Sequence, residues 1–208
     1  MISFAITTHN EGEYIQTLLS QLVPFCLESG DEIVVVDDYS KDPFTNSILE
    51  AYASDGTIKL HKHALNNHFA DHKNYLTDQC SGDYIFQIDA DEYLHDNLLN
   101  YVGELVGHNP YIDLFLVPRV NIVEGITEED IERYGWEVNE NNWIMFPDYQ
   151  TRIYRNHPDI RWINKVHERI VGHKQMAPLP EAEEWAIYHV KTIERQRAQN
   201  EYYATLQV

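Results

Sequence analysis

Three carboxylates, Asp89, Asp91 and Glu92, follow the short apolar run Tyr84 to Ile88 and form the densest group of candidate chemical residues in the chain. Acids this close repel one another unless a cation lies among them. Oxygen ligands on a short turn suit Mg²⁺ or Mn²⁺, which keep coordination positions for phosphate oxygens. The group therefore predicts a divalent metal site, and a solvated turn after a strand is the alternative.

Polar residues also follow two earlier apolar runs. They are Thr7, Thr8, His9 and Glu11 at the end of the run 2–8, and Asp38 at the end of the run 31–38. The carboxyl ends of parallel strands meet at one edge of a sheet, which is where open α/β sheets bind ligands. We therefore expect all three polar groups to converge on one edge that can hold a nucleotide.

The segments that must position these residues alternate between strands and helices. Short runs rich in β-branched and aromatic residues predict strands, and apolar residues three or four positions apart predict helices. Strands are expected over 2–8, 31–38, 57–61, 84–88 and 112–118, and helices after residue 12 and over 45–52, 69–79 and 97–106. This alternation predicts an α/β fold with a mostly parallel sheet flanked by helices.

The second half of the chain is less regular. Residues 120–145 are acidic and rich in Asn, and we expect an excursion over the active face, where variable substrate-binding loops usually lie. Short strands over 149–154 and 160–163 are expected to form a small mixed sheet. A strand over 185–190 and a helix over 192–206 complete the predicted elements.

Charge limits the partners. The 208 residues include 15 Lys and Arg against 34 Asp and Glu, a formal net charge of -19. This charge argues against nucleic acid and anionic membranes as partners, and a phosphate-bearing ligand would need a local cation. The chain has no apolar run of the roughly 20 residues that span a bilayer and no basic, apolar leader. We expect a cytoplasmic protein without a transmembrane segment.

Four sequence blocks, in this order, resemble the glycosyltransferases of family 2, which have the GT-A fold. They are Thr7 to Glu11, Val35 to Asp42, Phe69 to Asn74, and Gly82 to Glu92. A later series resembles one branch of that family: Tyr149 to Asn156, Trp162, Val166-His167-Glu168 and His189. The resemblance covers nearly the whole chain.

The resemblance implies an inverting, metal-dependent glycosyltransferase. It would move a sugar from a nucleotide-diphosphate donor, expected to be a UDP-sugar, to a hydroxyl of a glycan, lipid-linked or protein acceptor, with Mn²⁺ or Mg²⁺ as cofactor. One GT-A domain, 1–208, would comprise a nucleotide-binding half, 1–118, and an acceptor-side half, 119–208. A nucleotide-sugar-binding module without catalysis is the alternative.

The resemblance also implies roles for individual residues. Nucleotide contacts fall on Thr7, Thr8, His9, Glu11, Asp38, Lys73, Asp89 and Ala90. The metal ligands would be Asp91, which is also a catalytic residue, together with Asp89 and His189. Glu168 is the first choice for the catalytic base and Asp148 the second. Acceptor or sugar contacts are expected from Trp136, Trp143, Arg152, Trp162 and His167.

Several of these residues have a structural alternative. Asp38 could cap the following helix, Lys73 could be a surface helix lysine, and His189 could be a structural histidine. The Glu129-Asp130 pair resembles the acidic pair that supplies the base elsewhere in the family, but an exposed helix start explains it better. No G-x-G-x-x-G follows a strand, which disfavours hydride transfer on a dinucleotide.

Overall fold

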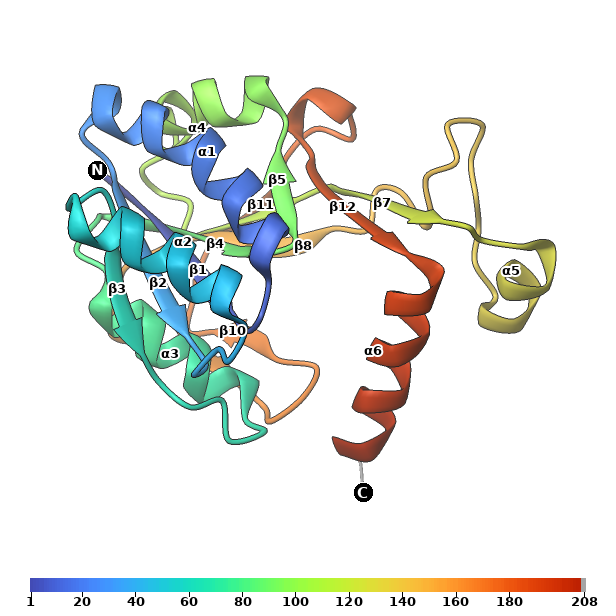
Figure 1. The fold of residues 1–208 in the computed structure, drawn as a ribbon. Coiled ribbons are helices and arrows are strands. Elements are labelled where there is room, and N and C mark those ends of the chain that lie inside the picture. Colours follow the sequence, from blue (N-terminus) through green and yellow to red (C-terminus); the bar gives the residue numbers. More distant parts are fainter. Residues whose placement is uncertain (207–208) are drawn as a thin grey trace.

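A seven-stranded sheet forms the centre of the computed structural model, which describes the backbone of residues 1–206 and the side chains of residues 1–202. Its strands are, in spatial order, β11 (Met176–Pro178), β6 (Leu114–Val117), β8 (Gln150–Arg155), β4 (Tyr84–Asp89), β1 (Ile2–Thr8), β2 (Glu32–Asp37) and β3 (Lys59–Lys62). Only β8 runs antiparallel to its neighbours. The predicted α/β fold with a mostly parallel sheet is confirmed (Figure 1). Residues 207–208 of the expected domain lie outside the described residues.

Helices cover both faces of this sheet because β1, β2 and β4 are buried on both sides. One face packs against α1 (Gly12–Ser29), α2 (Pro43–Ser54) and α4 (Asp96–His108). The other face packs against α3 (Phe69–Gln79) and the hairpin of β9 (Arg161–Ile163) with β10 (Arg169–Val171). The bounds of α3 are those expected from the sequence.

Gly82 allows the turn before β4 to pass very close to β1. A Cβ atom at Gly82 would lie 2.7 Å from the backbone nitrogen of Ser3. The Gly82 amide donates to Ser3 Oγ at 2.8 Å. This contact fixes where β4 begins and therefore where its acidic carboxyl end lies.

A second sheet of three strands lies beside the first. It contains β5 (Glu92–Leu94), β12 (Ile187–Thr192) and β7 (Arg119–Glu124), with β12 in the middle, antiparallel to β5 and parallel to β7. This is the expected small mixed sheet, but neither of the two segments expected to form it belongs to it, since residues 160–163 contribute β9, which pairs with β10 instead. The segment expected over 149–154 became β8 of the main sheet, because buried Ile153 and Tyr154 pack between β4 and β6.

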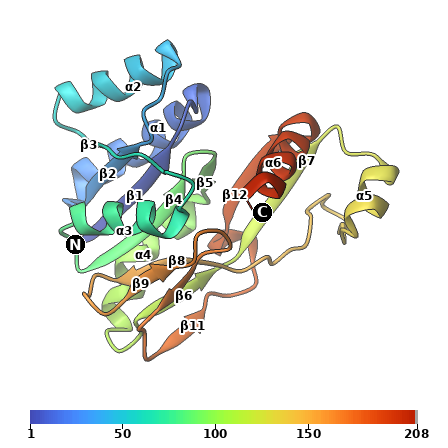
Figure 2. The same cartoon turned by 90° about the horizontal axis from the view of Figure 1, so that it is seen from below.

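After β7, residues 125–148 form an arm that projects from the rest of the structure and carries α5 (Glu128–Tyr134). In Figure 1 this arm and the helix α6 (Ile193–Leu206) project beyond the main sheet on the side of β7 and β12. Figure 2 shows α6 beside β12 and β7. The main sheet contains β8 and β11, which follow residue 118 in the sequence, together with strands that precede it. The predicted nucleotide-binding half and acceptor-side half therefore share one sheet.

Candidate functional site

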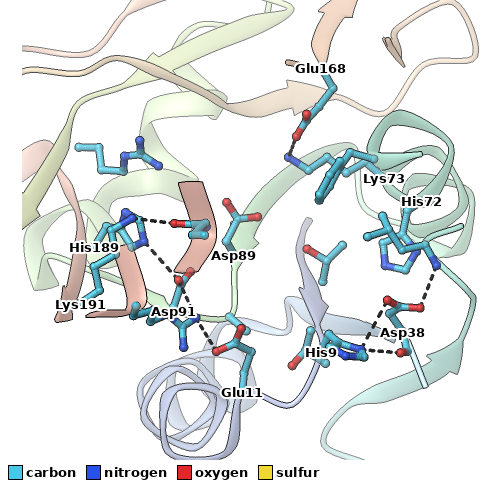
Figure 3. Close-up of a pocket in the computed structure, with 18 residues that line it drawn as sticks. His9, Glu11, Asp38, His72, Lys73, Asp89, Asp91, Glu168, His189 and Lys191 are labelled. Atoms are coloured by element: carbon cyan, nitrogen blue, oxygen red, sulfur yellow. Dashed lines mark hydrogen bonds and ion pairs between the residues drawn. The ribbon is translucent and has the colours of Figure 1, made fainter. Parts of the chain in front are cut away.

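A cavity of about 350 Å³, here named the central cavity, opens where β1, β2 and β4 end. Its lining includes every residue expected to contact the nucleotide, together with Asp91, Glu168 and His189 (Figure 3). The sequence did not single out seven further lining residues: Leu65, Phe69, His72, Arg119, Lys191, Arg195 and Gln199. Three neighbouring parallel strands thus bring their polar ends to one edge, as the topology requires.

Asp38 lies at one end of the central cavity and makes contacts within it. Its Oδ1 accepts from the Leu65 amide at 2.9 Å, and its Oδ2 lies 3.5 Å from His9 Nδ1. The cap of α2 is instead Asp42, which accepts from the Thr45 amide at 2.7 Å. Asp38 is therefore not a helix cap, and one of its carboxylate oxygens contacts His9 beside it in the cavity (Figure 3).

His72 supplies a neutral ring beside Asp38. The side chain is buried, and its Nδ1 lies 3.3 Å from Nδ1 of His63, which stacks on Tyr75. Burial lowers the pKa of His72 to about 4, although the charge of Asp38 opposes this change. At neutral pH this end of the cavity therefore offers a carboxylate and an uncharged imidazole.

Asp91 lies at the other end and contacts two nitrogen-bearing side chains through one oxygen. Its Oδ2 lies 3.2 Å from His189 Nε2 and 3.0 Å from Arg195 Nη2. Burial alone would raise the pKa of Asp91, but the hydrogen bond and charge of His189, with the charge of Arg195, lower it to about 2. Asp91 is therefore a carboxylate at neutral pH.

Asp91 and His189 are suitable donors for a divalent ion. Within the described part of the chain, no three His, Cys, Asp or Glu side chains are grouped to hold a metal without help. Mg²⁺ sites that bind nucleotides commonly use one or two protein ligands and complete their coordination with phosphate oxygens. Two converging donors fit that pattern. Asp89 fits less well, because its Oδ1 accepts from Gln87 Nε2 at 2.9 Å and its Oδ2 from Arg152 Nη2 at 2.6 Å, whereas Asp91 makes its contacts through Oδ2 alone.

Arg152 lies under Asp89 and is not open to a sugar-acceptor molecule. It is buried, and its Nη2 donates to both Asp89 Oδ2 and Glu92 Oε1 at 2.6 Å. Burial alone would lower the pKa of Arg152, but the charges of Asp89 and Glu92 raise it above its usual value. The expected acceptor contact of Arg152 needs correction, since the guanidinium has no free face toward a ligand. Its position holds Asp89 in place.

Glu168 reaches the central cavity from the loop before β10 and meets α3 there. Its Oε1 accepts from Lys73 Nζ at 2.6 Å (Figure 3). The Lys73 ammonium lies 4.5 Å from the centre of the Trp162 ring. Lys73 is therefore not a surface lysine. Trp162 is buried below it, with Nε1 3.2 Å from the hydroxyl of Tyr154, so the expected acceptor contact of Trp162 also needs correction.

Asp148 lines a neighbouring cavity of about 280 Å³, here named the second cavity. Its lining is Arg119, Asn121, Val123, Trp136, Ile144, Met145, Asp148, His189, Lys191 and Gln196. Asp148 Oδ2 accepts from Arg119 Nη2 and Asn121 Nδ2, each at 2.7 Å. Burial would raise the pKa of Asp148, but the charge of Arg119 and these hydrogen bonds lower it. Gln150 Nε2 also donates to Asp148 Oδ1 at 3.0 Å, so both oxygens of Asp148 accept hydrogen bonds, whereas the Lys73 bond engages only Oε1 of Glu168. This difference argues for Glu168 over Asp148 as the base.

The other expected acceptor residues lie in different surroundings. Trp136 lines the second cavity and packs with Val123 and Ile144. Trp143 packs against Phe146 with ring centres 4.9 Å apart, and His167 is exposed; neither is among the residues lining the two cavities. Asp130 forms a capping box with Thr127 at the start of α5, as the helix-start interpretation predicted, but its side chain is buried and pairs with Arg197 instead of being exposed.

Three cations that the sequence did not single out meet at the Asp91 end: Arg119, Lys191 and Arg195. Arg195 Nη2 also donates to Glu11 Oε2 at 2.7 Å. Lys191 is buried, and burial lowers its pKa to about 8 although Asp91 opposes this change. The two-residue spacing of His189 and Lys191 was a usable signal, because alternate residues of a strand share a face.

The family model described as glycosyl transferase family 2 matches residues 3–169. The chain therefore belongs to glycosyl transferase family 2, and the expected enzyme class, a glycosyltransferase, is confirmed at the level of the family. Among the helices in the described part of the chain, none is long and apolar enough to cross a membrane. The cytoplasmic location stays a prediction.

Two kinds of relative are similar to this chain. The undecaprenyl-phosphate 4-deoxy-4-formamido-L-arabinose transferase of Pseudomonas fluorescens (strain SBW25) is 32% identical over 94 residues, which are 43% of this chain and 27% of that protein. The crystal structure of S. aureus TarS 1-349 has a TM-score of 0.63 at 21% identity, covering 91% of this chain and 60% of that one. The same protein in complex with UDP-GlcNAc has a TM-score of 0.62 at 22% identity, covering 91% and 58%. These structures show the shared GT-A fold, while this chain spans only part of each relative.

Proposed function

We propose that this chain carries out inverting sugar transfer from a nucleoside-diphosphate sugar to an acceptor hydroxyl, with Mn²⁺ or Mg²⁺ bound at Asp91 and His189. The observation that carries the proposal is the convergence of Asp38, the Asp91–His189 pair and Glu168 on one cavity. These groups can respectively bind a nucleobase, hold a metal and diphosphate, and accept a proton. An unrelated polar cleft would not need all three.

The nucleoside would occupy the Asp38 end of the central cavity. Asp38 Oδ2 can accept a hydrogen bond from a base N–H group, and the neutral ring of His72 can pack or bond without repelling it. Glu11 and Thr8 line the path toward Asp91. The TarS structure with UDP-GlcNAc is a reason to test UDP first, and the base remains to be identified by that test.

The diphosphate would occupy the Asp91 end. The metal supplies Lewis-acid stabilisation of the charge that develops on the leaving nucleoside diphosphate. Asp91 and His189 would hold the ion, and Arg152 holds Asp89 beside them. This arrangement gives an acidic chain a local cationic site for phosphate.

Glu168 is the proposed base. The acceptor oxygen would form a bond to the anomeric carbon as the bond from that carbon to the phosphate oxygen breaks, and Glu168 would take the acceptor proton. Lys73 fixes the carboxylate through its 2.6 Å hydrogen bond. A single displacement of this kind inverts the configuration at the anomeric carbon.

The acceptor would enter through the second cavity, which shares Arg119, His189 and Lys191 with the central cavity. Trp136 offers an aromatic wall there, and Asp148 positions Arg119. A glycan, a lipid-linked molecule and a protein are all candidate acceptors. The Pseudomonas relative is named for a lipid phosphate, so lipid-linked acceptors belong in the screen.

Thermal unfolding with a panel of UDP, GDP, CDP and ADP, with and without Mn²⁺, tests the donor site. A ligand that binds only the native state raises the melting temperature, by an amount that depends on its concentration relative to its Kd. We expect one nucleotide to give a metal-dependent rise. No rise with any of them at millimolar concentration would contradict the proposal.

The corresponding UDP-sugar panel then separates an enzyme from a binding module. We expect slow donor hydrolysis and faster release of the nucleotide when an acceptor is present. Binding without hydrolysis or transfer would favour the binding module, in which the Lys73–Glu168 ion pair keeps the carboxylate from acting as a base.

A further inference from the structure

Lys191 lies on β12 two residues after His189, and both side chains are buried on the same side of the strand. Alternate residues of a strand are about 7 Å apart, so the two side chains can contact neighbouring parts of one ligand. Lys191 lines the central cavity, the second cavity and a third cavity lined by Tyr14 and Tyr93. It is therefore at the junction of the spaces around Asp91, as Figure 3 shows for the central cavity.

The ammonium group of Lys191 is buried without a carboxylate partner. Its Nζ donates to Gln199 Oε1 at 2.9 Å, and no ion pair of Lys191 occurs among the described side chains. The side chain is only 7% exposed. A buried ammonium that lacks an anionic partner is unfavourable, and two of its three N–H donors have no partner within the described protein.

Its cationic neighbours differ from it in this respect. Arg195 is paired with Glu11 and Asp91, and Arg119 with Asp148 and Glu92. Their charges are already balanced by protein carboxylates. Lys191 is the cation at this end of the cavity whose charge is left for a ligand.

We propose that Lys191 binds the diphosphate of the nucleotide sugar and stabilises the nucleoside diphosphate as it leaves. This inference rests on the proposed function. When the bond between the anomeric carbon and the phosphate oxygen breaks, the electron pair stays on that oxygen, and the Lys191 ammonium offsets the added charge without giving up its proton. Charge-assisted hydrogen bonds to phosphate are stronger than neutral ones, so loss of this contact should weaken the binding of UDP more than that of uridine.

The test compares Lys191→Met, Lys191→Arg and the exposed control Lys174→Met by calorimetric titration with UDP, UMP and uridine in the presence of Mn²⁺. We expect Lys191→Met to weaken UDP binding by about ten- to a hundredfold, which is the range for a hydrogen bond to a charged group. Uridine affinity should stay within about threefold, because the nucleoside end is far from Lys191. Lys191→Arg should recover most of the UDP affinity, and Lys174→Met should match the wild type.

Thermal unfolding without ligand gives a second readout that a structural lysine would not produce. Replacing a buried, unpaired ammonium by the similar-sized Met side chain should raise the melting temperature of the free protein, even as UDP raises it less. A higher melting temperature of the free variant, together with a smaller rise on adding UDP, would support the inference.

Two results would overturn the inference. A Lys191→Met protein that is less stable without ligand but binds UDP like the wild type would show that Lys191 has a structural role only. A wild-type protein that binds neither UDP nor any other nucleoside diphosphate would overturn the proposed function and this inference with it. The first of these results overturns only the role of Lys191 and leaves the proposed function standing.

Discussion

The carboxylates and the cations of the central cavity come from different regions of the chain. Glu11, Asp38, Asp89 and Asp91 lie within the first 91 residues, whereas Arg119, His189, Lys191 and Arg195 lie after residue 118. The carboxylates follow strands of the main sheet, and three of the four nitrogen-bearing side chains belong to β12 and α6. Among the ion pairs that the described residues form along the cavity, the Lys73–Glu168 pair is the exception. Its cation comes from the first region and its carboxylate from the second.

This difference indicates how a chain of net charge -19 would form the proposed phosphate site. Its acidic ligands are fixed locally, because each ends a buried strand. Its cations reach the same edge only through the long-range packing of β12 against β5 and β7. In the proposed site, the first region therefore supplies Asp38 for the nucleobase and Asp91 for the metal, and the second region adds His189 as a metal ligand together with the cations that balance the charge.

The largest expected effect comes from breaking the acidic side at Asp91. Asp91→Asn should lower the rate of sugar transfer by about a thousandfold or more, because it removes the proposed metal ligand and with it several kcal/mol of charge stabilisation. The melting temperature should also fall, because Asn gives up the ion pairs of Asp91 with His189 and Arg195, so the rates are compared at a temperature where both proteins are folded. Initial rates across a Mn²⁺ titration measure the effect.

The exposed Asp159→Asn is the matched control for Asp91→Asn and should keep the wild-type rate. If the wild-type enzyme were fully active in the presence of a chelator, Asp91 would have no metal to hold.

Glu168→Gln separates chemistry from donor binding. Removing a general base costs about a hundred- to ten-thousandfold in rate, so transfer should nearly stop. Donor affinity should remain within about threefold, because Gln can still accept from Lys73. Single-turnover transfer and donor titration measure the two quantities. An unchanged transfer rate would assign the base to another residue, and the exposed Glu181→Gln serves as the control.

Arg152→Met tests whether this residue supports Asp89 or contacts the acceptor. It leaves Glu92 buried without its closest cation, and breaking such a pair costs about 3–5 kcal/mol of unfolding free energy. Urea unfolding measures the loss. The double variant Arg152→Met/Glu92→Gln should recover part of it, since the unpaired charge is then gone. Wild-type stability combined with a raised KM for the acceptor would restore the acceptor role.

The smallest expected effect is the pH dependence conferred by His72. Its pKa in the folded protein is about 4, below its ordinary value of 6.5. Between these two values the unfolded chain binds more protons, so stability is lost as the pH falls from about 6.5 toward 4. Allowing for partial solvent access, wild-type protein should lose about 1 kcal/mol between pH 7 and pH 5 through His72.

Urea unfolding of His72→Phe at pH 7 and pH 5 measures this term. The variant should lose less stability on acidification than the wild type, and His157→Phe, at an exposed ring, should behave like the wild type. Equal losses in all three proteins would assign the acid sensitivity to other groups.

The sequence by itself determined the acidic side of the site. The runs that became β1, β2 and β4 are apolar on both faces, and parallel strands must place their carboxyl ends at one edge, which brought Asp38 and Asp91 together without any knowledge of distant contacts. The same local patterns gave the bounds of α3 and the helix start at Glu129-Asp130.

Only the tertiary structure decided the cationic side and the fate of several expected contacts. Arg195 reaches Asp91 across 104 residues, and Arg152 reaches Asp89 because β8 enters the main sheet beside β4. Trp162 is buried for a related reason, since β9 packs on the face that α3 covers. Periodicity tells which face of an element is apolar, but strand order and side-chain reach decide which elements meet, and those depend on the packing of the whole chain.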